Sequence, residues 1–269
     1  MAAAAAPVLV NLNTELGYGI LTIQKEPVNS LDLTMWTALQ TALDSLEANP
    51  AIHGVIIQSG LTKNVFSAGN DLLELYAPAT TKARYSEFWT VSNAFLVNLY
   101  RSRLATVAAI KGASPAGGCI IAMCCEHRLM TPTGVIGLNE VALGIPVPKF
   151  WSHLMSDIIG VRAAESILLT GQMYSPPEAL KAGLVDQLVE GPQLLPASER
   201  LMSHLMSLPQ LARSNTKRNL RSEFAAKWEA YYATEATDGW AMLILPATLK
   251  TLAGALQRLG KTVPPSAKL

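Results

Sequence analysis

Residues 137–146, GLNEVALGIP, hold one carboxylate, Glu140, in a run that is otherwise free of charge. Asn139 precedes this acid, and a Gly144-Ile145-Pro146 turn follows it. Apolar neighbours predict a raised pKa for Glu140, because burial disfavours the charged form of a carboxyl group. A carboxylate of this kind is suited to general acid/base catalysis. The alternative is an ordinary glutamate at a helix start or on the surface.

Two turns rich in small residues form a second chemical feature. In FSAGND, Ala68 and Gly69 end a buried strand and open a helix. In PAGGCI, Gly117 and Gly118 do the same. Amides at a helix N-terminus lack partners within the helix, and small residues let a ligand approach them. Two such amides converging on one point would form an oxyanion hole. Losing one donor from such a hole costs roughly 3–4 kcal/mol of transition-state stabilisation. Ordinary packing turns are the alternative.

Other chemical motifs are incomplete. GASPAG resembles a hydrolase nucleophile elbow, but Ala116 replaces the second glycine that the elbow requires. The three cysteines fall within residues 119–125, a spacing that fits neither a disulfide framework nor a zinc site. We therefore expect buried free thiols, no metal site and no serine hydrolase chemistry.

Composition limits the possible partners. The chain has 269 residues, of which 50% are hydrophobic and 15% are charged, with a net charge of +1. This supplies a large core, and the weak net charge argues against binding to nucleic acid or to a membrane surface. No apolar run has the length of a membrane span. The surplus of apolar residues predicts self-association.

The elements that must position these groups alternate between strands and helices. Residues 8–23 predict two strands around a turn, and Ser30 or Asp32 is expected to cap the next helix. Further segments follow in order: strand 54–60, a strand end and helix at 65–76, helix 82–103, strand 105–112, a helix or strand through the cysteines, and strand 126–140. This alternation predicts an α/β fold. From Ala197 to Gly260 the sequence is nearly all helix-forming. We therefore divide the chain into a core at 1–195 and a helical region at 196–269.

Taken together, these segments resemble the crotonase superfamily, and within it the mitochondrial-type Δ3,Δ2-enoyl-CoA isomerases. The matching stretches are PVNSL, VFSAGNDL, IKGASPAGGCIIAMCCEHRLM, IGLNEVALGI and SPPEALKAGLVDQLV, in this order between residues 25 and 190. The resemblance implies a spiral of ββα units with a C-terminal helical region that builds a trimer or a dimer of trimers.

The same resemblance implies roles for individual residues. The amides of Ala68 and Gly117 would form the oxyanion hole for a thioester carbonyl. Glu140 would be the single general acid/base, and Asn139 would position it or contact the substrate. The remaining predicted substrate-binding residues are Gly69, Asn70, Asp71, Leu72, Arg84 and Tyr85, and Asp71 fits equally well as a helix cap.

One substitution separates the activities expected within this superfamily. Its hydratases use two glutamates, and Ile120 occupies the position of one of them. A double-bond shift needs only one carboxylate to move a proton between two carbons. We therefore expect conversion of 3-enoyl-CoA to 2-trans-enoyl-CoA in the breakdown of unsaturated fatty acids, with no cofactor beyond the CoA of the substrate. A hydratase, a thioesterase and a non-catalytic acyl-CoA-binding protein are the alternatives.

Three structural expectations and one targeting signal complete the prediction. Glu126 is expected to pair with Arg128, Glu74 to face solvent, and Lys217 to match a lysine frequent in the family. The terminal Ala267-Lys268-Leu269 resembles a peroxisomal address. The mitochondrial matrix is the alternative location, although the first 25 residues carry no arginine.

Overall fold

A computed structural model of the chain describes residues 6–264. Its main sheet has six strands in the order β1-β2-β3-β4-β6-β8. Strands β1 and β2 are antiparallel, and every later neighbour is parallel. A second, small sheet pairs β5 with β7. The strands span Val8–Asn13 (β1), Tyr18–Ile23 (β2), Gly54–Ser59 (β3), Ala105–Ile110 (β4), Ser114–Pro115 (β5), His127–Met130 (β6), Ile136–Gly137 (β7) and Gln187–Leu188 (β8).

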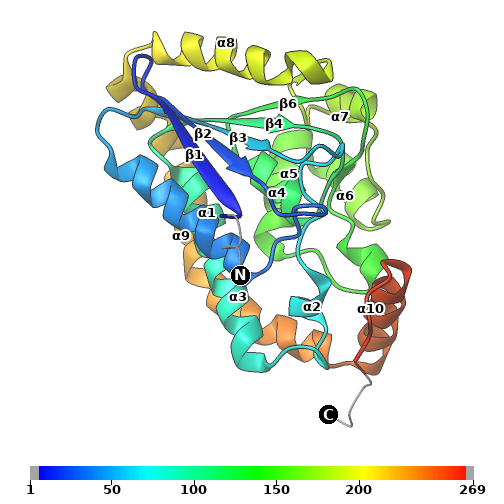
Figure 1. Cartoon of the computed structure of the whole chain (residues 1–269). Helices are drawn as coiled ribbons and strands as arrows, with labels where there is room; N and C mark the ends of the chain where they lie inside the picture. Colours follow the sequence, from blue (N-terminus) through cyan, green and yellow to red (C-terminus); the bar gives the residue numbers. More distant parts are fainter. Residues whose placement is uncertain (1–5, 265–269) are drawn as a thin grey trace, which may run out of the picture.

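Helices cover both faces of the main sheet, which explains why its central strands are mostly apolar. Helix α8 lies across one face, and α1, α3 and α4 lie on the other (Figure 1). All six residues of β4 are buried, as expected for a parallel strand with helices on both sides. The helices span Leu33–Ala48 (α1), Leu72–Leu75 (α2), Lys82–Arg101 (α3), Gly117–Cys124 (α4), Lys149–Ile159 (α5), Val161–Leu168 (α6), Pro176–Ala182 (α7), Leu194–Met206 (α8), Gln210–Leu243 (α9) and Pro246–Arg258 (α10), with short 3-10 helices at Glu140–Leu143 (η1) and Gly191–Gln193 (η2).

The expected α/β fold is confirmed, and two local alternatives are resolved. Asp32, and not Ser30, caps α1, and its side chain accepts a hydrogen bond from the amide of Met35 at 2.9 Å. The cysteine segment is helical. The single strand expected at 126–140 is wrong, because β6 and β7 are separate strands in different sheets. Between them the chain turns at Gly134, whose φ of +117° and close packing on Gly112 exclude a side chain.

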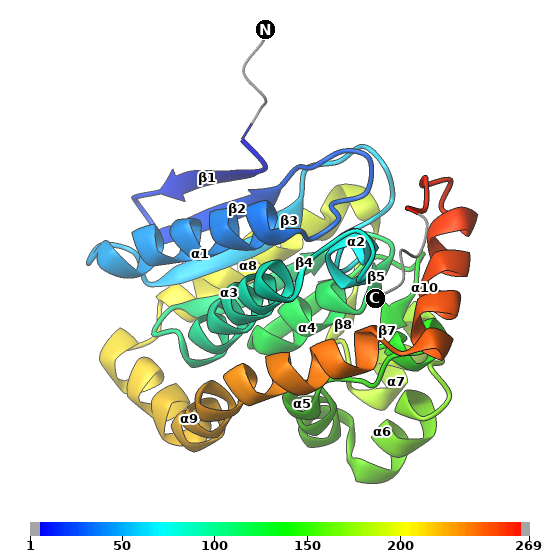
Figure 2. The same cartoon turned by 90° about the horizontal axis from the view of Figure 1, so that it is seen from below.

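The C-terminal helices extend the molecule away from the sheet. Helix α9 runs along α3, and α10 turns back beside α2 and the small sheet (Figure 2). Among residues 6–264 no single helix is long and apolar enough to cross a membrane; α9 and α10 meet that test only as a pair, bent by 84°. The division into 1–195 and 196–269 stays a prediction.

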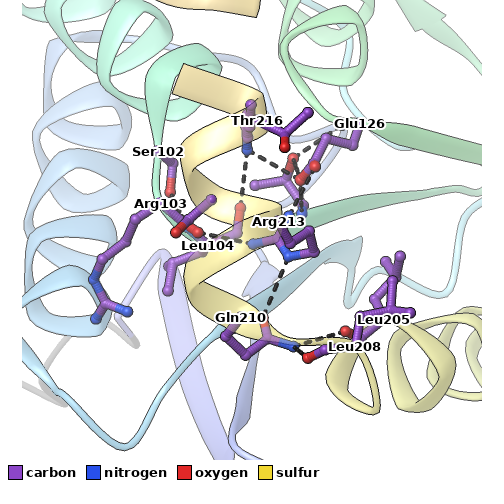
Figure 3. A network of polar contacts seen from close by, with 12 residues as sticks. Ser102, Arg103, Leu104, Glu126, Leu205, Leu208, Gln210, Arg213 and Thr216 are labelled. Atoms are coloured by element: carbon purple, nitrogen blue, oxygen red, sulfur yellow. Dashed lines mark hydrogen bonds and ion pairs between the residues drawn. The ribbon is translucent and has the colours of Figure 1, made fainter. Parts of the chain in front are cut away.

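A charged cluster attaches α9 to the sheet. Glu126 accepts hydrogen bonds from Arg213 at 2.8 Å and from Lys217 at 3.0 Å, and Figure 3 shows Arg213 pointing toward Glu126. Lys217 also donates to the carbonyl oxygen of Leu104. Burial raises the pKa of Glu126, but the two cations outweigh burial and hold this pKa below its usual value. Burial lowers the pKa of Lys217 to about 8.

The pair predicted between Glu126 and Arg128 is therefore wrong. Arg128 pairs instead with Asp186, at 3.1 Å. The partners of Glu126 lie 87 and 91 positions further along the chain. Proximity in sequence favoured Arg128, whereas the packing of α9 along α3 brings the actual partners beside the residue that precedes β4.

Candidate active site

Glu140 is the first residue of η1, directly after the small sheet. The turn ends at Gly144, whose left-handed conformation (φ +76°) suits glycine, and Gly144 packs against Thr251 of α10. Glu140 is only 4% exposed, and neither of its carboxylate oxygens has a hydrogen-bond partner within residues 6–264. Burial raises its pKa to about 7, and only the nearby backbone amide of the same residue acts in the opposite direction. No other charged group contributes to this shift, so Glu140 is electrostatically isolated.

Glu140 lies in the wall of a cavity of about 880 Å³. Residues of α2, α3, η1, α5, α9 and α10 line this cavity, which places it at the end of the molecule where α10 approaches α2 (Figure 2). Much of the lining is apolar, including Leu72, Leu75, Leu143, Val147 and Leu243. A cavity of this size and character can hold an extended apolar group.

The second glycine turn holds strained backbone beside the cavity. Ala116 lines the cavity and has a φ of +47°, which is unusual for a residue with a side chain. Gly117 follows it as the first residue of α4, and its amide donates no hydrogen bond within the described part of the chain. A methyl group on Gly117 would lie 2.8 Å from Leu31 and 3.0 Å from Asn70. The turn therefore leaves one backbone donor without a partner close to Asn70, although Gly117 itself is buried and does not line the cavity.

The first turn differs from the prediction at Ala68. The amide of Ala68 donates to the carbonyl oxygen of Val28 at 2.9 Å, so this predicted oxyanion-hole donor is already occupied. Ala68 and Val28 both line the cavity. Sequence reasoning missed this contact, because Val28 lies forty residues earlier and its carbonyl carries no sequence signal.

The structure brings most of the other predicted site residues to the cavity. Asn70, Asp71, Leu72, Tyr85 and Asn139 line it together with Glu140. Gly69 does not line the cavity, but its φ of +80° shapes the turn, and a side chain there would meet the carbonyl oxygen of Pro115.

Arg84 lies outside this cavity. Its guanidinium pairs with Glu74 at 2.7 Å, and Glu74 also accepts a hydrogen bond from the amide of Leu33 at the start of α1. The prediction of a solvent-facing Glu74 is therefore wrong, since Glu74 is buried. Both residues hold α1, α2 and α3 together and have no contact with the cavity.

Asp71 has the structural role of a helix cap, one of the two roles that the sequence predicted for it. It caps α2 by accepting a hydrogen bond from the amide of Leu73 at 3.0 Å, and it pairs with Lys261 at 2.7 Å. Although burial opposes the charge, these partners lower the pKa of Asp71. Lys261 follows α10 and also lines the cavity, which could not be predicted from its isolated position near the C-terminus.

Comparison with known proteins places the chain in a family. The family model for enoyl-CoA hydratase/isomerase matches residues 15–238. The chain belongs to the enoyl-CoA hydratase/isomerase family. Enoyl-CoA delta isomerase 1, mitochondrial, from Mus musculus is 39% identical over 220 residues, which cover 81% of this chain and 75% of the relative. The Homo sapiens protein of the same name is 37% identical over 222 residues, which cover 82% of this chain and 72% of the relative.

Solved structures of this family share the fold. The crystal structure of human mitochondrial delta3-delta2-enoyl-CoA isomerase superimposes with a TM-score of 0.90 at 34% identity and covers 94% of this chain and 98% of that one. An enoyl-CoA hydratase from Bacillus halodurans gives a TM-score of 0.84 at 25% identity, with 92% and 99% covered. The expected crotonase-like fold with a C-terminal helical region is confirmed.

Ile120 helps to distinguish a hydratase from an isomerase, the two activities that the family name contains. It lies on α4, is fully buried, and does not line the cavity. Glu140 thus has no carboxylate partner at the position predicted for a second hydratase acid. The cavity lining also includes the carboxylates of Asp71, Glu235 and Asp238, and none of them contributes to the raised pKa of Glu140.

Proposed function

We propose that this protein is a Δ3,Δ2-enoyl-CoA isomerase that converts 3-cis- and 3-trans-enoyl-CoA to 2-trans-enoyl-CoA during β-oxidation of unsaturated fatty acids. The observation that carries the proposal is the isolation of Glu140, a buried carboxylate with both oxygens unpaired in the wall of a cavity whose lining is largely apolar. The relatives named as enoyl-CoA delta isomerases support the same activity.

The proposed reaction uses Glu140 as base and then as acid. Its carboxylate takes a proton from carbon 2 of the acyl chain, and the electron pair of that C–H bond moves to form a dienolate. The protonated carboxyl group then returns the proton to carbon 4, which leaves the double bond between carbons 2 and 3. A pKa of about 7 suits both steps, because catalytic acids and bases work best near the operating pH.

The negative charge of the dienolate falls on the thioester oxygen. The unpaired amide of Gly117 is the first donor proposed for this oxygen. The amide of Ala68 becomes the second donor when the thioester oxygen replaces the carbonyl of Val28. Asn139 is proposed to contact the substrate or to position Glu140, since its buried Oδ1 has no partner within residues 6–264.

A proton transfer of this kind requires neither a metal nor a redox cofactor, and CoA enters as part of the substrate. The hydratase alternative would need a second acid to activate water, which Ile120 cannot supply. A thioesterase would also need an activated water. A non-catalytic acyl-CoA-binding protein would have no use for a buried, unpaired carboxylate, which costs folding stability when ionised.

The test compares the wild type with Glu140→Gln on a 3-enoyl-CoA, monitored by absorbance of the conjugated product. We expect the wild type to isomerise the ester and the variant to lose between about 10²- and 10⁴-fold in kcat. Glu223→Gln, on the exposed face of α9, is the matched control and should retain full activity. Faster hydration of a 2-enoyl-CoA than isomerisation by the wild type would reject the proposal in favour of a hydratase.

Two further properties are proposed on narrower grounds. Self-association as a trimer or dimer of trimers is supported by Leu211 and Leu220 of α9, which are 76% and 77% exposed. Light scattering would measure the mass of the assembly.

The peroxisomal address at Ala267-Lys268-Leu269 lies outside the described residues, and relatives named as mitochondrial support the matrix instead. Imaging a fluorescent fusion with and without these three residues distinguishes the two locations.

A further inference from the structure

The side-chain amide of Asn70 carries a hydrogen-bond donor that the chain itself does not use. Its Oδ1 accepts a hydrogen bond from Nε1 of Trp36 at 3.2 Å. An indole nitrogen only donates, so this contact fixes which end of the amide is the oxygen and which is the NH2 group. Within residues 6–264, Nδ2 donates no hydrogen bond and is not among the unpaired side-chain atoms that are closed to solvent. Because Asn70 lines the cavity, its NH2 group is open to a ligand there.

The surroundings hold this amide in one orientation. Trp36 lies on α1, is fully buried and packs against Phe95 of α3, with ring centroids 5.7 Å apart. The backbone amide and carbonyl oxygen of Leu31 form hydrogen bonds with the residues on either side of Asn70. Donors that are oriented before the substrate binds need no reorganisation during the reaction, which makes them effective in stabilising a transition state.

The Asn70 amide lies beside the turn that carries Gly117. The first atom of a side chain on Gly117 would be 3.0 Å from Oδ1 of Asn70 and 3.3 Å from its backbone nitrogen. The absence of a side chain at Gly117 therefore makes room for the Asn70 amide. Gly117 supplies the first donor proposed for the thioester oxygen, so the NH2 group of Asn70 lies beside the place proposed for that oxygen.

The two backbone donors proposed for the thioester oxygen are less accessible. The amide of Ala68 donates to the carbonyl oxygen of Val28, and Gly117 is buried and does not line the cavity. The NH2 group of Asn70 differs from both, since it is unpaired and belongs to a residue in the cavity wall. Hydrogen bonds to an oxygen that gains negative charge become stronger, so a donor at this place favours the dienolate over the substrate.

We propose that the NH2 group of Asn70 donates a hydrogen bond to the thioester oxygen and stabilises the dienolate. The hydrogen bond strengthens as the electron pair released at carbon 2 moves onto this oxygen, and Asn70 neither gains nor loses a proton. Asn70 is thus a further catalytic residue, and Trp36 is the positioning residue that orients it. This inference rests on the proposed isomerase function.

Two substitutions at Asn70 test the donor. Asn70→Leu keeps a similar bulk without polar atoms, and Asn70→Asp keeps an oxygen that can accept from Trp36 but has no NH2 group. Both should lower kcat for a 3-enoyl-CoA by about 10²- to 10³-fold, the loss expected for one oxyanion donor. The Kd of Asn70→Leu for a saturated acyl-CoA, measured by calorimetry, should change by less than about threefold, because this ester develops no charge on its oxygen.

The division between kcat and KM separates this role from simple binding. A raised KM with an unchanged kcat would mean that Asn70 contacts the CoA arm equally in the substrate and the transition state, which overturns the inference. Asn98→Asp is the matched control and should keep the wild-type kcat, because Asn98 is a partly buried residue of α3 that does not line the cavity.

Trp36→Phe tests the positioning role, since it keeps an aromatic ring and removes the donor that orients Asn70. It should lower kcat about tenfold or more. Combined with Asn70→Leu, it should add little to the loss that Asn70→Leu causes alone, whereas additive losses would overturn the role of Trp36. An active wild type with unaffected Asn70 variants overturns the inference alone. A wild type that fails to isomerise the ester shows that the proposed function itself is wrong.

Discussion

The backbone amide of Ala68 donates its hydrogen bond to the carbonyl oxygen of Val28, 2.9 Å away. Val28 precedes Asn29, which has a φ of +52° and whose buried side chain donates to the carbonyl oxygens of Ile23 and Phe66. The Val28 carbonyl thus occupies a donor that the proposed dienolate needs. When the substrate binds, its thioester oxygen must replace the Val28 carbonyl oxygen as the acceptor for the Ala68 amide.

This exchange predicts a local change on binding. In a crystal structure with a saturated acyl-CoA, which cannot isomerise, the thioester oxygen should accept from the amides of Ala68 and Gly117. The Val28 oxygen should then lie more than about 3.5 Å from the Ala68 amide, beyond hydrogen-bonding distance. A bound thioester with the Val28 contact intact would remove Ala68 from the oxyanion hole.

The pH dependence of the rate follows from the pKa of Glu140, which burial raises to about 7. Glu140 must be ionised to take the proton from carbon 2. The value of kcat/KM should therefore be constant above pH 7 and fall about tenfold for each pH unit below it. Stopped-flow assays from pH 5 to 9 measure this profile, after the stability of the protein over that range is checked. A rate that stays constant down to pH 5 would contradict a raised pKa.

Ala116 is predicted to store strain beside the active site. Its φ of +47° with ψ of −114° is a conformation that glycine adopts far more easily. Ala116→Gly should relieve this strain but also increase the entropy of the unfolded chain. We expect a net increase of about 1 kcal/mol in the free energy of unfolding. Chemical denaturation measures the change. Ala122→Gly, in the interior of α4, is the control of opposite sign, and destabilisation by both variants would show that Ala116 is unstrained.

The cluster around Glu126 predicts a stability effect that is separate from catalysis. Glu126→Gln would leave Lys217 and Arg213 without their counter-charge, and breaking such a buried pair costs about 3–5 kcal/mol. Thermal unfolding should show this loss, whereas the matched surface variant Glu223→Gln should change stability by less than about 0.5 kcal/mol. An unchanged unfolding temperature for Glu126→Gln would contradict the attachment of α9 through this cluster.

The wild-type cluster should also lose stability in acid. The pKa of Glu126 is lower in the folded chain than in the unfolded chain. Its contribution is therefore present above the unfolded pKa and disappears as the pH falls through the folded pKa. Unfolding measured across acidic pH should show a steeper loss of stability for the wild type than for Glu126→Gln, in which Asp71 still contributes.

Local patterns predicted the parts of the fold that depend on neighbouring residues. The spacing of Leu33, Trp36 and Leu39 predicted α1, and the apolar run ending at Ile110 predicted β4. The break between β6 and β7 was missed because it depends on close packing of Gly134 against Gly112. That contact forms only after the strands have assembled.

The candidate site, too, was predictable where the signal lies in neighbouring residues and not where it depends on distant contacts. The lone charge of Glu140 in an apolar run is visible in the sequence, and the structure buries it as expected. Glu235, Trp89 and Trp151 were not singled out, because they belong to three helices and line the cavity together only when α3, α5 and α9 surround it.

In the proposed mechanism, the carboxylate of Glu140 alone moves one proton from carbon 2 to carbon 4. Isomerisation of a 3-enoyl-CoA deuterated at carbon 2, followed by mass spectrometry of the product, tests it directly. Because Glu140 is buried and has no partner to exchange protons with, we predict that a measurable share of the deuterium appears at carbon 4. Hydrogen from solvent alone at carbon 4, at every stage of the reaction, would contradict the single-carboxylate account.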